Sequence, residues 1–397
     1  MKGKWIVTLM AFVVVMATGL MLVGCKNESE EAYDTNDWLI EDGIVKRYLG
    51  TASDVKVPKG VKAVGNSAFF QRKSLKSVEI PEGVTWIGLS AFVGCENLIS
   101  VEIPDSVELI GNSAFSGCKS LRSVFIPSSI RGINGDTFYG CKSLTDVVIP
   151  EGVGAIGDSA FAGCESLTSV SIPSSLTRIE NRAFSGCKNL TSVRYGGTIA
   201  QWCTMQPWDS LFGLRGAEHV IIDGIDLKTM TSLVIPMGVR FIVSYAFYDC
   251  KNITSVSIPG SVTSINVNAF SGCESLTDVR YDGTIAQWCE IIGDLGQLMW
   301  NAKHVIVGGV DLKSMNNLVI PAGVKEIADY AFYKCEGLTN VDIPESVSSI
   351  GSSTFRQCKN LTSVHYNGTM SNWNAIEKGY GFGLGVTTVC SDGTINY

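Results

Sequence analysis

Thirteen cysteines and three histidines are the residues of this chain that could form disulfides, hold a metal ion or catalyse a reaction. Equivalent residues of stacked repeats lie about 4.7–4.9 Å apart and point the same way, so such cysteines pack as small buried hydrophobes more readily than as disulfides. Disulfides and a metal site are the alternatives, although the chain has no Cys-x-x-Cys pair of the kind found in zinc sites. We therefore predict free core cysteines at the nine positions that recur at one place in an internal repeat: Cys95, Cys118, Cys141, Cys164, Cys187, Cys250, Cys273, Cys335 and Cys358.

The histidines do not form a catalytic constellation. His219 and His304 occupy the same place in two equivalent irregular segments, so repetition explains them better than catalysis does. A catalytic site is a single constellation that breaks repeat symmetry, and no Ser/His/Asp order, carboxylate pair, phosphate loop or metal-ligand spacing does so here. We expect no enzymatic activity, no cofactor and no metal ion. The oxidation state of the cysteines in irregular segments stays open: Cys203, Cys289 and Cys390.

A 23-residue repeat positions these side chains. A fixed period of 20 to 50 residues indicates a solenoid, in which each unit buries its apolar face only by stacking on its neighbours. Ten of the eleven prolines occupy one position of the repeat: Pro58, Pro81, Pro104, Pro127, Pro150, Pro173, Pro236, Pro259, Pro321 and Pro344. Ten phenylalanines also share one position, and we expect them to stack as the spine of the core: Phe69, Phe92, Phe115, Phe138, Phe161, Phe184, Phe247, Phe270, Phe332 and Phe355.

Residues 98–121 show what each coil of the solenoid should look like. Val101 and Ile103 alternate with polar residues, which is the period of a strand. Pro104 then ends the strand, because proline has no N–H to donate to a neighbouring strand. The apolar residues of segment 114–121 are three to four positions apart, which predicts a short helical turn.

The pattern Leu-x-x-Val-x-Ile-Pro-x-x-Val-x-x-Ile-x-x-x-Ala-Phe-x-x-Cys-x-x-Leu resembles the bacterial BspA-like class of leucine-rich repeats over residues 44–397. The resemblance implies an α/β solenoid, a right-handed coil with a concave parallel β-sheet and short helices or turns on the convex side. It also implies a cell-surface protein that adheres to proteins of a host or of neighbouring cells. We place ten 23-residue units within residues 57–388, with irregular coils near 195–232 and 281–317.

An irregular segment interrupts the repeat three times, at residues 195–203, 281–289 and 366–374, with a period of 86 and then 85 residues. In the first of them, Thr198 has the position of an N-cap before a short helix. The helix of each segment carries a tryptophan that we expect to pack in the core: Trp202, Trp288 and Trp373. The alternative is an aromatic site, since exposed indoles could stack on sugars or anchor a protein partner.

The two ends of the chain differ from the repeat. Residues 1–24 combine lysines, an apolar block and small residues before Cys25, as in a secretory signal peptide. The Leu-Val-Gly-Cys ending resembles a bacterial lipobox, which implies a lipid on Cys25; an uncleaved membrane anchor is the alternative. Residues 25–32 form a polar tether. An Asp-Gly pair between apolar residues predicts hairpin caps at 33–56 and 389–397.

The strand residues between the inward-facing ones define a candidate binding face, because repeat proteins bind through extended sheets. An ordinary solvated sheet face is the alternative. The 31 basic and 38 acidic residues of the chain argue against nucleic-acid binding, which calls for a basic face. The candidate residues of the face are Phe125, Asp146, Val148, Arg194, Asp278 and Arg280.

These observations predict a protein of the bacterial cell envelope, anchored by its N-terminal lipid and exposed at the surface. We expect it to bind a macromolecular partner without chemistry, as an adhesin for an extracellular or cell-surface protein. Two alternatives remain at this stage. One is a carbohydrate-binding protein that uses the tryptophan segments, and the other is a passive spacer in the envelope.

Overall fold

The computed structural model describes residues 35–207, 210–381 and 386–396. The predicted signal peptide, Cys25 and the polar tether lie outside these ranges. The described residues from Asn36 onward form one compact unit of stacked coils. No helix within the described ranges is both long enough and apolar enough to cross a bilayer.

Each regular coil except the one at residues 121–143 contributes one long strand whose side chains alternate between core and solvent. Val101, for example, is buried between two exposed neighbours in Ser100–Glu102. Strands of adjacent coils pair in parallel and in register, so Val78 lies beside Val101. The long strands are β3 (Asp54–Lys56), β5 (Ser77–Glu79), β7 (Ser100–Glu102), β10 (Asp146–Val148), β12 (Ser169–Ile172), β14 (Ser192–Tyr195), β15 (His219–Ile222), β17 (Ser232–Val234), β19 (Ser255–Ile258), β21 (Asp278–Tyr281), β23 (His304–Val307), β25 (Asn317–Val319), β27 (Asn340–Ile343), β29 (Ser363–Tyr366) and β31 (Thr387–Cys390).

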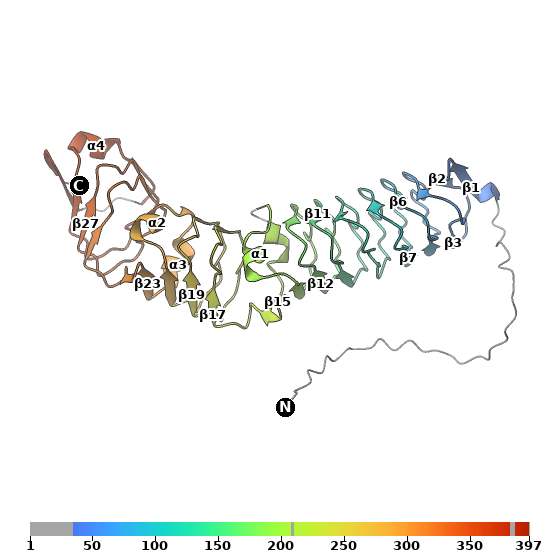
Figure 1. The fold of residues 1–397 in the computed structure, drawn as a ribbon, viewed down its shortest axis with the longest axis horizontal. Helices are drawn as coiled ribbons and strands as arrows, with labels where there is room; N and C mark the ends of the chain where they lie inside the picture. Colours follow the sequence, from blue (N-terminus) through green and yellow to red (C-terminus); the bar gives the residue numbers. More distant parts are fainter. Residues whose placement is uncertain (1–34, 208–209, 382–385, 397) are drawn as a thin grey trace, which may run out of the picture. The chain divides into compact units, whose positions relative to one another are not determined.

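A second strand of two residues pairs with its equivalents on the other side of the coils. Ile87 lies between Val64 and Ile110 in this way. These short strands are β4 (Ala63–Val64), β6 (Trp86–Ile87), β8 (Leu109–Ile110), β9 (Gly132–Ile133), β11 (Ala155–Ile156), β13 (Arg178–Ile179), β18 (Phe241–Ile242), β20 (Ser264–Ile265), β22 (Ile292–Gly293), β26 (Glu326–Ile327), β28 (Ser349–Ile350) and β30 (Glu377–Lys378). Figure 1 shows β7 and β12 on one side of the stack and β6 and β11 on the other.

The core between the two sets of strands is a column of stacked phenylalanines, as the repeat predicts. The rings of Phe92, Phe115 and Phe138 are buried, and their centroids are 5.1 Å and 5.6 Å apart with nearly parallel planes. The cysteines of the repeat lie beside this column. The column therefore buries a large aromatic surface in every coil.

The predicted helical turn after the second strand does not form a helix. Ser113 and Gly117 have φ values of 57° and 74°, which interrupts any helical run around Phe115. The N–H groups of Phe115 and Gly117 instead donate to the next coil, to Thr137 O at 2.9 Å and Tyr139 O at 2.7 Å. Bonds within the coil and bonds to the next coil thus alternate along this segment, so no continuous helix forms.

The helices of the described ranges lie in the irregular segments and at the N-terminal end. They are η1 (Thr35–Asp37), α1 (Ile199–Cys203), η2 (Ser210–Leu214), α2 (Ile285–Cys289), α3 (Gly296–Asn301) and α4 (Met370–Ala375). The predicted N-cap is confirmed, because the Thr198 hydroxyl accepts from Gln201 N while the Gln201 side chain accepts from Thr198 N. This capping box starts α1 and is repeated at the start of α2.

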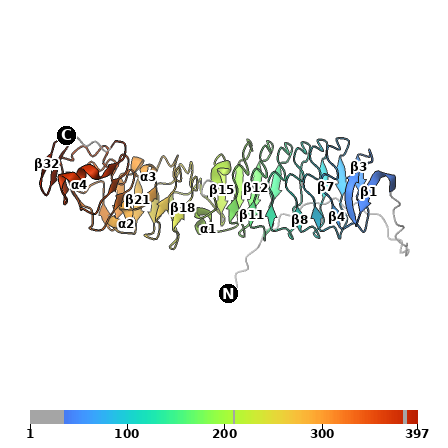
Figure 2. The same ribbon diagram turned by 90° about the horizontal axis from the view of Figure 1, so that it is seen from above.

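Two antiparallel hairpins separate the sheets of long strands, and a third ends the last sheet. The strand β16 (Ile225–Asp226) folds back on β15, β24 (Val310–Asp311) on β23, and β32 (Gly393–Ile395) on β31; Figure 2 labels β15 of the first hairpin and β32 of the third. Each hairpin is the last pair of its sheet. We call residues 36–226, 227–311 and 312–396 the first, second and third modules. In the first module the sheet also stops after β7 and resumes at β10, because residues 121–127 form no strand.

A fourth hairpin stands at the N-terminal end of the described residues. The strand β1 (Trp38–Glu41) pairs with β2 (Ile44–Tyr48) through a loop in which both residues, Asp42 and Gly43, have positive φ. The ring of Tyr48 stacks on Phe69, the first phenylalanine of the column, at 5.3 Å. The predicted hairpins at both ends are therefore confirmed, whereas the division of the chain into caps, tether and repeat domain stays a prediction.

Candidate binding surface

The outward residues of the long strands form a surface that we call the long-strand face. Phe125 and Val148 occupy equivalent positions of adjacent coils with 58% and 68% of their surface exposed. The predicted place of Phe125 on a strand is wrong, because segment 121–127 forms no strand, and Phe125 borders the face beside Val148. Asp146 is exposed on the same strand as Val148. Arg194 is exposed two strands further along, in register with Val148. These four predicted residues therefore lie on one module.

Asp278 and Arg280 lie elsewhere, on β21 of the second module. Both are exposed, but their sheet is separate from the sheet that carries Asp146 and Arg194. The Arg280 guanidinium donates to Asp282 Oδ1 at 2.6 Å, whereas Arg194 makes no ion pair within the described ranges. The six predicted residues thus belong to two surfaces of related composition.

The predicted aromatic alternative is wrong, because Trp202, Trp288 and Trp373 are buried. An indole without accessible surface cannot stack on a sugar. The exposed tryptophan of this region is Trp300 in α3, which is 57% exposed and stacks on Tyr333 at 5.3 Å.

The buried tryptophans join one module to the next. In a regular coil, the carbonyl before each phenylalanine accepts from the backbone of the preceding coil, as Ala114 O does from Phe92 N at 2.7 Å. At the two module joints, this donor is an indole N–H: Trp202 Nε1 donates to Ala246 O at 2.8 Å and Trp288 Nε1 to Ala331 O at 2.9 Å. The tryptophans therefore replace backbone donors that the irregular segments cannot supply.

Two lysines supply a second missing donor at the same joints. The carbonyl after each phenylalanine, such as Tyr139 O, accepts a backbone N–H in a regular coil. At the joints, Lys228 Nζ donates to Tyr248 O at 2.5 Å and Lys313 Nζ to Tyr333 O at 2.7 Å. Burial lowers the pKa of Lys313. The sequence signal for this pair is Asp-Leu-Lys at 226–228 and again at 311–313.

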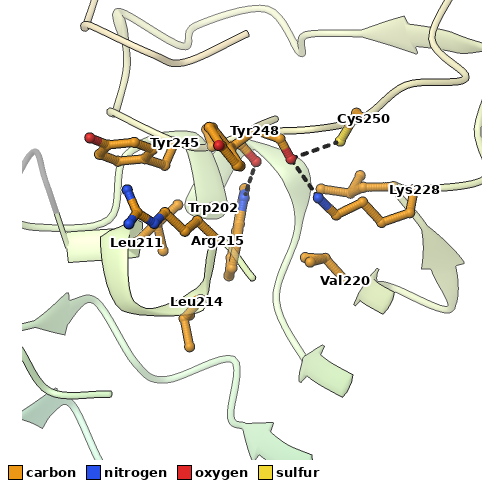
Figure 3. A pocket seen from close by; sticks show the side chains of 11 residues that line it. Trp202, Leu211, Leu214, Arg215, Val220, Lys228, Tyr245, Tyr248 and Cys250 are labelled. Atoms are coloured by element: carbon orange, nitrogen blue, oxygen red, sulfur yellow. Dashed lines mark hydrogen bonds between the residues drawn. The ribbon is translucent and has the colours of Figure 1, made fainter. Parts of the chain in front are cut away.

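A small pocket at the first joint is a consequence of this arrangement. Trp202, Lys228, Tyr245 and Tyr248 are among the residues that line it, and Figure 3 shows Trp202 and Lys228 both directed at backbone oxygens. Its volume of about 10 Å³ is room for no more than about one water molecule. No cluster of metal-ligating side chains occurs in the part of the chain that the structure describes.

A histidine–aspartate pair in two of the module hairpins escaped the sequence analysis. His219 Nδ1 lies 2.7 Å from Asp226 Oδ2, and His304 Nδ1 lies 2.9 Å from Asp311 Oδ2. Burial opposes ionisation of Asp311, but the hydrogen bond from His304 and two backbone N–H bonds outweigh it and lower the pKa of that carboxyl. The repeated seven-residue spacing of His and Asp is the signal that could have found the pair.

We expect the Asp311→Asn substitution to bring the pKa of His304 back toward the ordinary 6.5. The hydrogen bond to Asp311 raises the pKa of His304 in the folded chain. The pair therefore stabilises the hairpin fully at a pH below the His304 pKa of the unfolded chain. This stabilisation is lost as the pH rises through the His304 pKa of the folded chain. NMR titration of the imidazole measures the change. An identical His304 pKa in both proteins would show that the pair is not formed in solution.

Seven of the nine cysteines of the repeat donate to the backbone carbonyl of a phenylalanine in the preceding coil. Cys118 Sγ donates to Phe92 O at 3.2 Å, and Cys141 Sγ to Phe115 O at 3.3 Å. Burial raises the pKa of Cys95 to about 12 and that of Cys141 well above its ordinary value. All twelve cysteines within the described ranges are unpaired, Cys203, Cys289 and Cys390 included.

We expect these thiols to react only when the chain unfolds. A raised pKa leaves almost no thiolate at pH 8, and the thiolate is the reactive form. A chromogenic disulfide reagent should therefore modify the native chain slowly and all twelve thiols after denaturation without reductant. A lower count in the denatured sample would mean that some cysteines form disulfides.

The fold defines a leucine-rich repeat protein, a solenoid of stacked coils with parallel strands. The chain belongs to the BspA type of leucine-rich repeat: the family described as "BspA type Leucine rich repeat region (6 copies)" matches residues 47–166, 131–204, 226–290 and 311–378. No curated protein matches the chain.

Several solved structures are similar to the chain. One is a leucine-rich cell surface protein from Faecalibacterium prausnitzii, with 28% identity and a TM-score of 0.44 over 88% of this chain and 98% of that one. The leucine-rich repeat protein of T. pallidum has 31% identity and a TM-score of 0.40 over 47% of this chain and 95% of its own. A leucine-rich repeat protein from Bacteroides ovatus has 22% identity and a TM-score of 0.46 over 90% and 97%.

Proposed function

We propose that the protein binds an extracellular or cell-surface protein through the long-strand face of its first module, as an adhesin without enzymatic activity. The observation that carries the proposal is the pair of exposed apolar side chains, Phe125 and Val148, at one position of adjacent coils. Aromatic side chains such as that of Phe125 are enriched in the buried cores of protein interfaces, and charges lie at the polar rim. Asp146 and Arg194 are such charges.

The stacked coils support this proposal physically. The strands that carry Asp146, Val148 and Arg194 are held by inter-coil hydrogen bonds and by a buried core, so this part of the surface is formed before a partner arrives. A preformed surface loses little conformational entropy on binding. Asp146 Oδ1, for instance, already accepts from Ser169 Oγ at 2.5 Å.

The test is binding of the purified full chain to arrays of extracellular-matrix proteins and glycans. We expect saturable binding to a protein, weakened at least about tenfold in the Phe125→Ser/Val148→Ser variant. Tyr139→Ser is the matched control, because Tyr139 is about half exposed but belongs to the turn after Phe138. Binding to glycans alone would contradict the proposal and indicate a carbohydrate site other than the buried tryptophans. Absence of binding on both arrays would favour the passive spacer.

We also propose that a lipid on Cys25 anchors the chain at the surface of a bacterial envelope. The support is the Leu-Val-Gly-Cys ending of the apolar block that opens the sequence. Replacement of Cys25 by Ala should abolish incorporation of radiolabelled palmitate. Persistent labelling of that variant would rule the anchor out.

A further inference from the structure

The outward residues of the long-strand face repeat from module to module. The first long strand after each division of the sheet carries an exposed valine: Val148, Val234 and Val319 are 68%, 62% and 61% exposed. Two strands further along, the residue in register with this valine is an arginine or a histidine: Arg194, Arg280 and His365. On the next strand, the first strand of the hairpin, the residue in the same register is aliphatic: Ile221, Ile306 and Val389.

Stacking of the coils does not require this repetition. The earlier strands of the first module have Lys56, Glu79 and Glu102 at the strand position of Val148, so this position accepts unrelated side chains. A valine that is mostly exposed also contributes little to the core. Duplication of a module would also copy these outward residues without any selection for binding. A binding measurement therefore decides whether each of the three modules binds a partner.

We propose that the three modules carry three equivalent binding sites, which take three copies of one short segment of a repetitive partner protein. This inference rests on the proposed function and deepens it. The segment has a carboxylate beside an aliphatic side chain, because the carboxylate complements Arg194 or Arg280 and the aliphatic group covers the exposed valine. Arg194 makes no ion pair in the described part of the chain, whereas the carboxylate has to replace Asp282 at Arg280. In the third module the site offers His365 and also carries Asp342 in register with it.

The spacing of the sites fits a flexible chain that carries several copies. Equivalent strands, β10 to β17 and β17 to β25, are four coils apart. Three of the four steps are paired strands and span about 15 Å at the strand spacing, and the fourth crosses a hairpin without strand pairing, so the separation is on the order of 20 Å. A Gly/Ser linker of about 13 residues has a root-mean-square length of about 20 Å, so it can join neighbouring sites. Simultaneous engagement then raises the overall affinity by about 100-fold or more.

The experiment compares two synthetic peptides on the purified full chain. One holds a single copy of Val-Ser-Glu-Ser-Val, and the other holds three copies joined by 13-residue Gly/Ser linkers. We expect the three-copy peptide to bind about 100-fold more tightly, and a Lys-for-Glu version not to bind. Arg194→Glu and Arg280→Glu should each lower the ratio of the two affinities, three-copy over single-copy, by about tenfold or more.

The matched control is Lys188→Glu, an exposed charge reversal in the coil of Arg194 but outside its strand. It should leave both peptides unaffected. Equal affinity of the two peptides, or an effect of only one of the two arginine substitutions, would overturn the three-site proposal. No binding of either peptide would overturn it too. The array measurement with Phe125→Ser/Val148→Ser decides separately whether the proposed function stands.

Discussion

The Trp288→Ala substitution should lower the free energy of unfolding by about 3–5 kcal/mol, the range for removal of a fully buried large aromatic side chain. The indole of Trp288 has no exposed surface and joins the second module to the third. Its removal leaves a cavity and also deprives Ala331 O of its donor. Urea unfolding of the full chain, followed by circular dichroism, measures the loss.

Two further variants separate the contributions at this joint. Trp288→Phe keeps most of the ring but lacks Nε1–H, so it should lose about 1–3 kcal/mol for the unsatisfied carbonyl. Trp300→Ala is the matched control, because the Trp300 side chain is mostly exposed, and its loss should stay near 0.5 kcal/mol or slightly above. Equal losses for Trp288→Ala and Trp300→Ala would mean that the indole of Trp288 is not part of the core.

The fold could be predicted from the sequence where a residue's role is set within its own repeat. The ten phenylalanines and the alternation around Val101 recur at fixed positions, and stacking puts equivalent residues in register. The hairpin at Asp42 and Gly43 could also be predicted from the sequence, because its turn depends on two adjacent residues. Each of these signals is local or periodic.

The features that the sequence analysis missed depend on partners in another coil. Spacing alone favoured a helix around Phe115, but N–H groups there bind the next coil, which no local pattern reveals. The burial of Trp202 was expected from its helix, whereas its role as a donor to Ala246 depends on where a distant segment packs. The division of the candidate face follows from hairpins at 223–224 and 308–309 that the analysis overlooked, although Asp-Gly and Gly-Gly are turn signals.

The Phe115→Ala substitution should also lower the free energy of unfolding by about 3–5 kcal/mol. Phe115 lies inside the longest run of the column, with its ring centroid 5.1 Å from that of Phe92 and 5.6 Å from that of Phe138. Each coil of a solenoid is stabilised mainly by its two neighbours, so one missing ring weakens two interfaces at once. The cavity cannot close easily, because inter-coil hydrogen bonds on both sides fix the spacing of the coils.

The position of a phenylalanine in the column should therefore decide how much its loss matters. Phe270 has one phenylalanine neighbour within the described ranges, Phe247 at 5.3 Å, whereas Phe115 has two. We expect a smaller loss for Phe270→Ala than for Phe115→Ala, and a loss near 0.5 kcal/mol for Phe70→Ala, whose ring is about half exposed. The same urea unfolding experiment ranks the three variants. If Phe270→Ala and Phe115→Ala were equally destabilised, burial of each ring alone would account for the core, and stacking between neighbouring rings would add nothing measurable.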